Sequence, residues 1–207
     1  NKNKREDGAI VGCKWVEGRW PGKGALRFSG ENDRVKLKLR TNPSSGTLAV
    51  WMRMDSHRNS LTPILHAASN ARGILAWGIT KKGNLLLQAK QGSQVVDFVS
   101  PVVFTSNQVG QWVHLTTTYD SKQGKVAHYF NGLYKGSENL PAQVRFSLNG
   151  CDLGNLNSKE KNAPQGHNFR GLIDEFIVFR KALDAETVLR LYEIGRPFPV
   201  SRLDHLP

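Results

Sequence analysis

Paired carboxylates are the residues of this sequence that could hydrolyse a sugar. A retaining glycoside hydrolase needs two carboxyl groups about 5 Å apart, and alternate residues of one strand share a face. The nearest approach is the run Glu31–Lys36 (ENDRVK), in which lysine stands where the second acid is needed. Asp174 and Glu175 are adjacent, so on a strand we expect them to point to opposite faces and not to act on one substrate. The sequence therefore predicts a protein that is not an enzyme.

Trp51, Arg53 and Asp55 are the candidate residues for binding. On a strand these alternate positions share a face and could line a groove. Aromatic rings stack on sugar faces, while polar and charged groups bond the hydroxyls. Trp51 also fits a structural role. Trp15 and Trp20 flank a turn, where we expect them to pin the N-terminal segment down.

Turn signals divide most of the chain into short apolar or alternating runs, at the spacing typical of a β-sandwich. Asn131-Gly132 predicts a tight type I′ hairpin. Trp112–Tyr119 reads as a central strand, in which we expect His114 to be a buried core histidine; Trp77 also reads as core. We predict a surface loop over residues 152–168.

Only one helix is indicated, near the C-terminal end. Asp184 is a good N-cap, and Val188, Leu191 and Tyr192 recur at helical spacing before Gly195. We therefore expect an all-β fold: a two-sheet antiparallel jelly-roll sandwich of 12–14 strands with one short C-terminal helix. The expected domain covers residues 10–198, with a linker at 1–9 and a tail at 199–207.

The net charge of +12, from 29 basic and 17 acidic residues, raises the question of a polyanionic partner. The basic residues Arg34, Lys36, Lys38 and Arg40 alternate with apolar ones, which is typical of a strand with one face in water. We predict no nucleic-acid partner; contact with another polyanion, an anionic membrane face or an acidic polysaccharide, remains the alternative. No apolar run approaches the roughly 20 residues that span a bilayer.

The two cysteines, Cys13 and Cys151, lie far apart and outside any zinc-binding spacing. In an oxidising compartment a bridge between them would close a long loop and contribute about 4–5 kcal/mol in the chain-entropy model. We predict this disulfide; two buried free thiols are the alternative.

Six motifs occur in the order found in laminin-G-like jelly rolls of the concanavalin A-like lectin/glucanase superfamily, and together they carry a resemblance to that family. It rests on residues 24–35 (GALRFSGENDRV), 47–53 (TLAVWMR), 112–120 (WVHLTTTYD), 129–132 (YFNG), 169–175 (FRGLIDE) and 182–195 (ALDAETVLRLYEIG). The opening Trp15–Lys23 resembles the version of this domain in FecR-type anti-sigma regulators, which cross the bacterial inner membrane once.

This resemblance implies an extracytoplasmic binding module whose partner is a glycan. A protein-interaction or sensory ectodomain of a membrane-anchored FecR-type regulator is the alternative. The family also implies a rim Ca²⁺, for which Asn32, Asp33 and Asp174 are the expected ligands because Ca²⁺ takes oxygen donors. In the other interpretation, Asp174 accepts backbone N–H bonds and ties two loops together without a metal.

Overall fold

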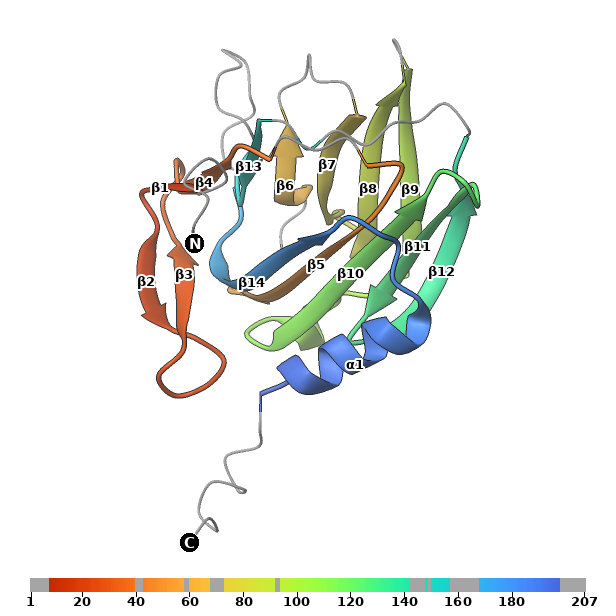
Figure 1. Cartoon of the computed structure of the whole chain (residues 1–207). Coiled ribbons are helices and arrows are strands. Elements are labelled where there is room, and N and C mark those ends of the chain that lie inside the picture. Colours follow the sequence, from red (N-terminus) through yellow and green to blue (C-terminus); the bar gives the residue numbers. More distant parts are fainter. Residues whose placement is uncertain are drawn as a thin grey trace, which may run out of the picture.

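The fold is a sandwich of two antiparallel sheets (Figure 1). The computed structural model describes residues 8–39, 43–57, 60–67, 73–91, 94–141, 148, 150–156 and 168–197. Within them the first sheet has the order β1 (Ala9–Val11), β4 (Arg34–Leu37), β13 (Cys151–Leu153), β6 (Thr62–Ala67), β7 (Gly73–Ile79), β8 (Asn84–Gln91) and β9 (Gln94–Val102). The second has the order β12 (Leu133–Asn139), β11 (Lys125–Phe130), β10 (Trp112–Asp120), β5 (Ser45–Met54), β14 (Gly171–Phe179), β3 (Gly24–Phe28) and β2 (Lys14–Glu17). The predicted jelly-roll sandwich is confirmed.

Alternation along β5 shows how each strand of the second sheet serves two faces. Leu48, Val50 and Met52 point into the core between the sheets, so Trp51 and Arg53 point to the outer face. On β10, which pairs with β5, His114 lies opposite Trp51 and therefore shares that outer face. This face, which lies at the bottom of Figure 1, is the one that α1 crosses.

A series of hydrogen-bonded side chains crosses the apolar core between the sheets. Trp77 of the first sheet donates its indole N–H to Thr117 of the second sheet at 2.8 Å, and the Thr117 hydroxyl contacts His128 Nδ1 at 2.9 Å. Trp77 is fully buried, as the sequence predicted. Burial lowers the pKa of His128 from 6.5 to about 4, because the interior disfavours the imidazolium ion.

The hairpin and the helix form as their sequences predict. Asn131 and Gly132 have φ of 49° and 76°, the two left-handed residues of a type I′ turn between β11 and β12. Helix α1 spans Ala185–Gly195, and Asp184 caps it by accepting the backbone N–H of Thr187 at 2.7 Å. A 3₁₀ turn, η1, covers Ser106–Gln108.

Cys13 and Cys151 are free thiols, so the predicted disulfide is wrong in this structure. Cys13 follows β1, and Cys151 begins β13; both strands pair with β4, one on each side. Strands on opposite sides of a third lie roughly 9–10 Å apart, beyond the roughly 7 Å that a disulfide spans between Cα atoms. Burial raises the pKa of Cys13 to about 11 and that of Cys151 to about 12.

The alternating basic run is solvated at two of its described positions, whereas the side chain of Arg34 is only 15% exposed and lies 3.7 Å from Asp152. Lys36 and Lys38 are exposed, whereas Val35 between the basic positions is buried. Arg40 lies outside the described residues, as do most of the predicted loop 152–168 and almost all of the predicted terminal segments 1–9 and 199–207.

Candidate functional site

The guanidinium of Arg19 joins three distant segments on the outer face of the second sheet. Its Nε donates to Asp174 Oδ2 at 2.9 Å, one terminal nitrogen donates to Glu175, and the other donates to the carbonyl of Gly195 at the end of α1. Lys23 also bonds Glu175 and lies 3.9 Å from Asp174 Oδ1. The Arg19 side chain is wholly buried, and we call this cluster the Arg19 centre.

A backbone irregularity brings Asp174 and Glu175 to the same cations. The pairing of β14 with β5 shifts between Asp174 and Ile177, and Glu175 has a left-handed φ of 56°. The prediction that the adjacent carboxylates point to opposite faces is therefore wrong. Burial alone would raise the pKa of Glu175, but its bonds to Lys23 and Arg19 hold that pKa below its usual value.

Trp51 forms the floor of the Arg19 centre and is only 2% exposed. The Arg19 guanidinium lies 4.5 Å from its ring centroid, Tyr192 of α1 stacks on it at 5.5 Å, and His114 lies 5.0 Å away. A Cβ atom on Gly195 would come within 2.5 Å of the indole nitrogen, so the helix approaches this closely because residue 195 is glycine. Trp51 as a sugar-stacking ring is therefore a wrong prediction: helix α1 and Arg19 cover it.

His114 is buried, at 2% exposure, as the sequence predicted, but it lies on the outer face of the second sheet and not in the core between the sheets. Burial, helped by the charge of Arg19, lowers its pKa from 6.5 to about 4. The imidazole is consequently neutral at physiological pH and does not compete with Arg19 for the two carboxylates.

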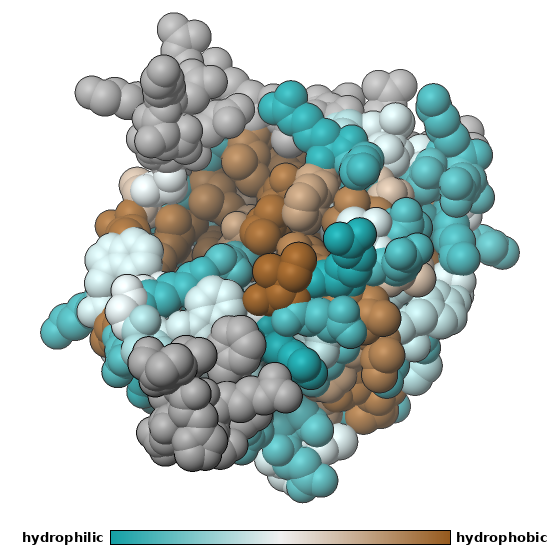
Figure 2. All heavy atoms as spheres, turned by 60° about the horizontal axis from the view of Figure 1, so that its bottom comes forward, coloured by the Kyte–Doolittle hydropathy of each residue, from teal (hydrophilic) through white to brown (hydrophobic). Residues whose placement is uncertain are grey.

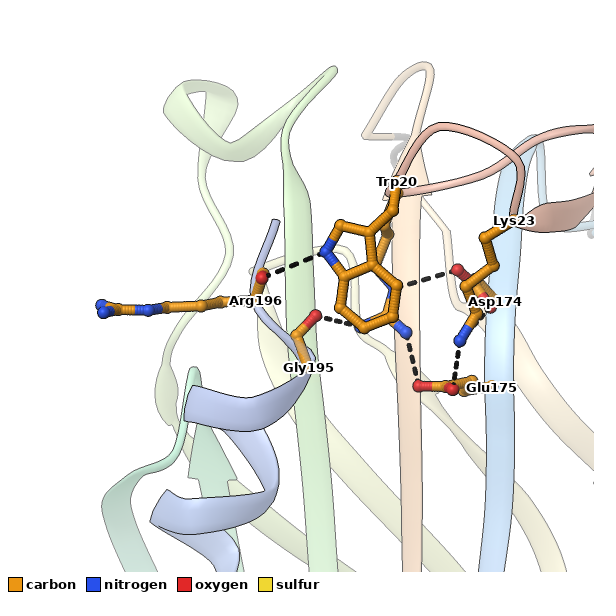
Figure 3. Close-up of polar contacts among 7 residues, drawn as sticks. Trp20, Lys23, Asp174, Glu175, Gly195 and Arg196 are labelled. Atoms are coloured by element: carbon orange, nitrogen blue, oxygen red, sulfur yellow. Dashed lines mark hydrogen bonds and ion pairs between the residues drawn. The ribbon is translucent and has the colours of Figure 1, made fainter. Parts of the chain in front are cut away.

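The two N-terminal tryptophans have different roles. Trp20 covers the Arg19 guanidinium at 4.6 Å and donates its indole N–H to the carbonyl of Arg196 at 3.3 Å, so it pins its segment as predicted (Figure 3). Trp15 is 67% exposed, on edge strand β2. Its ring lies against Gly24 of β3 but is mostly exposed, so Trp15 holds the N-terminal segment less firmly than Trp20 does.

Arg53 lines an open groove of about 410 Å³ on the same outer face. Register places Arg53, Leu172 and Arg27 in one row across β5, β14 and β3. The Arg53 guanidinium lies 5.7 Å from the ring of Trp112, and Arg27 pairs with the exposed carboxylate of Asp55 at 2.8 Å. We call this surface the arginine groove; it is lined by Val16, Glu17, Gly18, Arg27, Arg53 and Leu172.

The structure thus separates the predicted binding set. Arg53 lines the arginine groove, and Asp55 pairs with Arg27 of the same groove. Trp51, in contrast, is buried beneath Arg19. The aromatic ring beside the groove is Trp112, which is partly buried and which the sequence analysis placed only in a central strand. The signal that could have revealed it is register, because Trp112 pairs with Arg53.

The expected calcium ligands have other partners. Asp33 Oδ2 accepts the backbone N–H groups of Ser29 and Gly30, both at 2.8 Å, and Asp174 is paired with Arg19. Asn32 is exposed in the same turn as Asp33. Over the described ranges no three His, Cys, Asp or Glu residues gather as a metal site would require. Calcium binding stays a prediction. If Ca²⁺ is bound, EDTA should lower the melting temperature of the protein.

A sequence profile of the Concanavalin A-like lectin/glucanases superfamily matches residues 29–189, which include both partners of the Trp112–Arg53 contact and the acids of the Arg19 centre. The chain belongs to this family. A comparison with curated proteins found no match.

Solved structures share the fold at low sequence identity. The binding domain of Paraclostridial Mosquitocidal Protein 1 has a TM-score of 0.72 and 17% identity over 90% of this chain and 47% of its own. The Botulinum Neurotoxin Type G receptor binding domain has a TM-score of 0.66 and 18% identity, over 90% of this chain and 46% of its own. The binding domain of Botulinum Neurotoxin DC, in complex with SialylT, also has a TM-score of 0.66 and 18% identity, over 91% of this chain and 47% of its own. The chain therefore spans about half the length of these structures.

A further groove, of about 320 Å³, is mainly apolar. Trp15, 67% exposed, and Ile10, 42% exposed, lie at its rim, and Leu26 and Ile173 reach it from the core. Figure 2, in which the underside of Figure 1 comes forward, shows apolar side chains gathered in a hollowed part of the surface, bordered by hydrophilic ones. None of the described helices is long and apolar enough to span a membrane.

Proposed function

We propose that this family member is a non-enzymatic binding module that recognises carbohydrate outside the cytoplasm, and that the arginine groove is its site. The observation that carries the proposal is the row of Arg53 and Arg27 beside Trp112, with the carboxylate of Asp55 exposed at its edge. Guanidinium groups donate several hydrogen bonds in a fixed plane, and a carboxylate accepts them, so the set suits the paired hydroxyls of a sugar.

The contacts of Arg53 explain how the groove could hold a saccharide. Its guanidinium contacts the Trp112 ring rather than a carboxylate, and Leu172 forms an apolar floor beside it. A sugar needs such a mixture, because its C–H faces prefer an apolar surface while its hydroxyls need donors and acceptors. The family description and the complex of the neurotoxin DC binding domain with SialylT support the same ligand class.

The arrangement of acids supports binding rather than hydrolysis. Asp174 and Glu175 are the carboxylates that β14 brings together, and both are neutralised by Arg19 and Lys23. Asp174 is 4% exposed, so a sugar has no access to it. A hydrolase needs an acid and a nucleophile that both face the substrate.

The test is a glycan array with the folded chain, probed with and without calcium, beside Arg53→Ala and Lys36→Ala. Lys36 is exposed on β4 of the other sheet, so its replacement removes the same charge away from the groove. We expect the parent and Lys36→Ala to retain the same glycans, and Arg53→Ala to lose them. Equal losses in both variants would mean that only net charge matters, and binding to no glycan would overturn the proposal.

A second candidate function has its own observation. The exposed Trp15 and Ile10 at the apolar groove favour a protein partner, as in an interaction or sensory ectodomain of a membrane-anchored FecR-type regulator. This function predicts that an extracytoplasmic protein is captured by the parent chain and by Arg53→Ala, but not by Trp15→Ser. Capture that Trp15→Ser leaves unchanged would contradict it.

A further inference from the structure

A polar hollow of about 370 Å³ lies where the start of α1 meets the outer face of β10, β11 and β12. Its volume is in the range of small-ligand sites. Its walls combine aromatic, amide, carboxylate and ammonium groups, contributed by Thr118, Asp120, Gln123, Lys125, Ala127, Tyr129, Tyr134, Ala182, Leu183, Asp184 and Ala185. We call it the Tyr134 hollow.

The wall formed by the segment before α1 is held firmly to the sheet. The Thr47 hydroxyl donates to the carbonyl of Lys181 at 2.8 Å and accepts the N–H of Leu183 at 3.0 Å. Leu183 and Val188 are buried against Ala127 and Tyr129 in a small apolar cluster. The hollow is therefore preformed, which lowers the entropic cost of binding.

Two tyrosine rings form the aromatic side of the hollow. Tyr129 is 6% exposed and meets Tyr134 edge to face, with ring centroids 5.7 Å apart. Tyr134 is 50% exposed, and its hydroxyl donates to Ser137 at 2.9 Å, which fixes the ring. Lys125 Nζ lies over this ring, 5.9 Å from its centroid, and the part of the ring that stays exposed gives the hollow an oriented aromatic surface.

Two carboxylates at the hollow accept backbone N–H groups, and the side chain of Thr187 also bonds that of Asp184. Asp120 Oδ1 accepts the backbone N–H groups of Lys122 at 2.8 Å and Gln123 at 3.1 Å, and Asp184 Oδ1 accepts that of Thr187. A carboxylate has a second oxygen with its own lone pairs, so each group can still accept from a ligand hydroxyl. The exposed Gln123 amide adds both a donor and an acceptor.

We propose that the Tyr134 hollow binds one pyranose unit of a neutral saccharide. Its C–H face stacks on Tyr134, and its hydroxyls bond Asp120, Asp184 and Gln123. Two carboxylates against the single ammonium of Lys125 disfavour an anionic sugar here, despite the positive charge of the whole chain. The inference deepens the proposed carbohydrate function and adds a second site.

The hollow and the arginine groove can be tested separately because they lie far apart. Trp112, beside the groove, and Asp120, in the hollow, are eight residues apart on strand β10, which is roughly 27 Å at the rise of a strand. One monosaccharide cannot reach both.

The test is a titration of the ¹⁵N-labelled chain with the methyl pyranosides of glucose, galactose, mannose and N-acetylglucosamine, followed by backbone amide shifts. We expect at least one sugar to shift amides around Asp120, Lys125 and Tyr134. Tyr134→Ala should weaken that binding about tenfold, because it removes the stacking surface. Tyr134→Phe and Leu133→Ala should retain it; Leu133, also exposed, is the neighbouring residue of β12.

Each outcome decides the inference. Shifts at the hollow that Tyr134→Ala weakens and Arg53→Ala leaves unchanged support it, even if the arginine groove binds nothing. No shift around the hollow with any of the four sugars overturns it, as does binding that Tyr134→Ala leaves unchanged. The amide spectrum of each variant shows directly that the variant is folded.

Discussion

The Arg19 centre and the Tyr134 hollow lie at opposite ends of α1, on the same outer face of the second sheet. Both combine aromatic rings with charged side chains. In the Arg19 centre every charge has an opposite partner, and Trp51 is 2% exposed. In the hollow, Tyr134 is 50% exposed and polar groups face open space. An aromatic residue beside charges therefore indicates a binding site only where no other segment already occupies the ring.

Helix α1 makes the difference between the two regions. Its last turn brings Tyr192 onto Trp51 and the carbonyl of Gly195 to Arg19, which closes that end. Its first turn rests on Ala127 and Tyr129 through Val188 and leaves Tyr134 uncovered. The helix thus stabilises one end of the face and forms a wall of a cavity at the other.

Trp51→Ala should have the largest effect, a loss of about 3–5 kcal/mol in the free energy of unfolding, because it opens a cavity beneath Arg19 and Tyr192. Urea denaturation of the parent and the variant measures it. If Trp51→Ala instead loses glycan binding at unchanged stability, the ring contacts the ligand. The description of the Arg19 centre as a region closed to ligands would then be wrong.

Arg19→Ala should cost about 3 kcal/mol, because it leaves the buried Asp174 without its nearest charge while Lys23 remains within reach. Arg27→Ala is the matched control. It breaks an exposed pair with Asp55, which is worth about 1 kcal/mol or less. Equal denaturation midpoints for the two variants would contradict the description of the Arg19 centre as a buried clamp.

Lowering the pH should destabilise the fold in the window between the ordinary and the folded pKa of two buried histidines. His114 and His128 have pKa values of about 4 in the fold against 6.5 ordinarily, so the unfolded chain takes up their protons first. Their stabilising contribution is complete above pH 6.5 and is lost as the pH falls toward 4.

Urea titrations between pH 7 and pH 4 measure this loss. His114→Gln should lose less stability than the parent over that interval, because one of the two titrating groups is gone. The same loss in both proteins would show that His114 titrates normally and does not lie in the closed region.

Tyr134→Ala should have the smallest effect on folding, about 0.5 kcal/mol or less, since the ring is half-exposed. The same urea experiment checks this value. Destabilisation as large as that of Trp51→Ala would remove the distinction between an open and a closed aromatic region.

Much of the fold could be predicted from the sequence because its signals are local. Alternating residues place Val50 and Met52 inside, Asn131-Gly132 takes the one turn that two left-handed residues allow, and Asp184 caps its own helix. Each of these depends on residues that are close together in the chain.

The site could be predicted only in part, because it depends on contacts between distant segments. Trp51 is covered by Tyr192, which follows it by more than a hundred residues, so its strand pattern could not show its burial. Glu175 meets the cations that bind Asp174 through a bulge and a left-handed φ, which the pattern of a regular strand excludes. Strand alternation did place Arg53 in the groove, whereas Asp55 follows the end of β5 and reaches the groove's edge through its ion pair with Arg27.

A crystal structure of the chain with the saccharide that it retains best on the array tests the central claim most directly. The account predicts that the sugar lies on the outer face of the second sheet, with its hydroxyls bonded to Arg53 in the arginine groove and the Arg19 centre unchanged. A sugar bound between the sheets or on the first sheet, with Arg53 still against Trp112 and free of ligand, would contradict it.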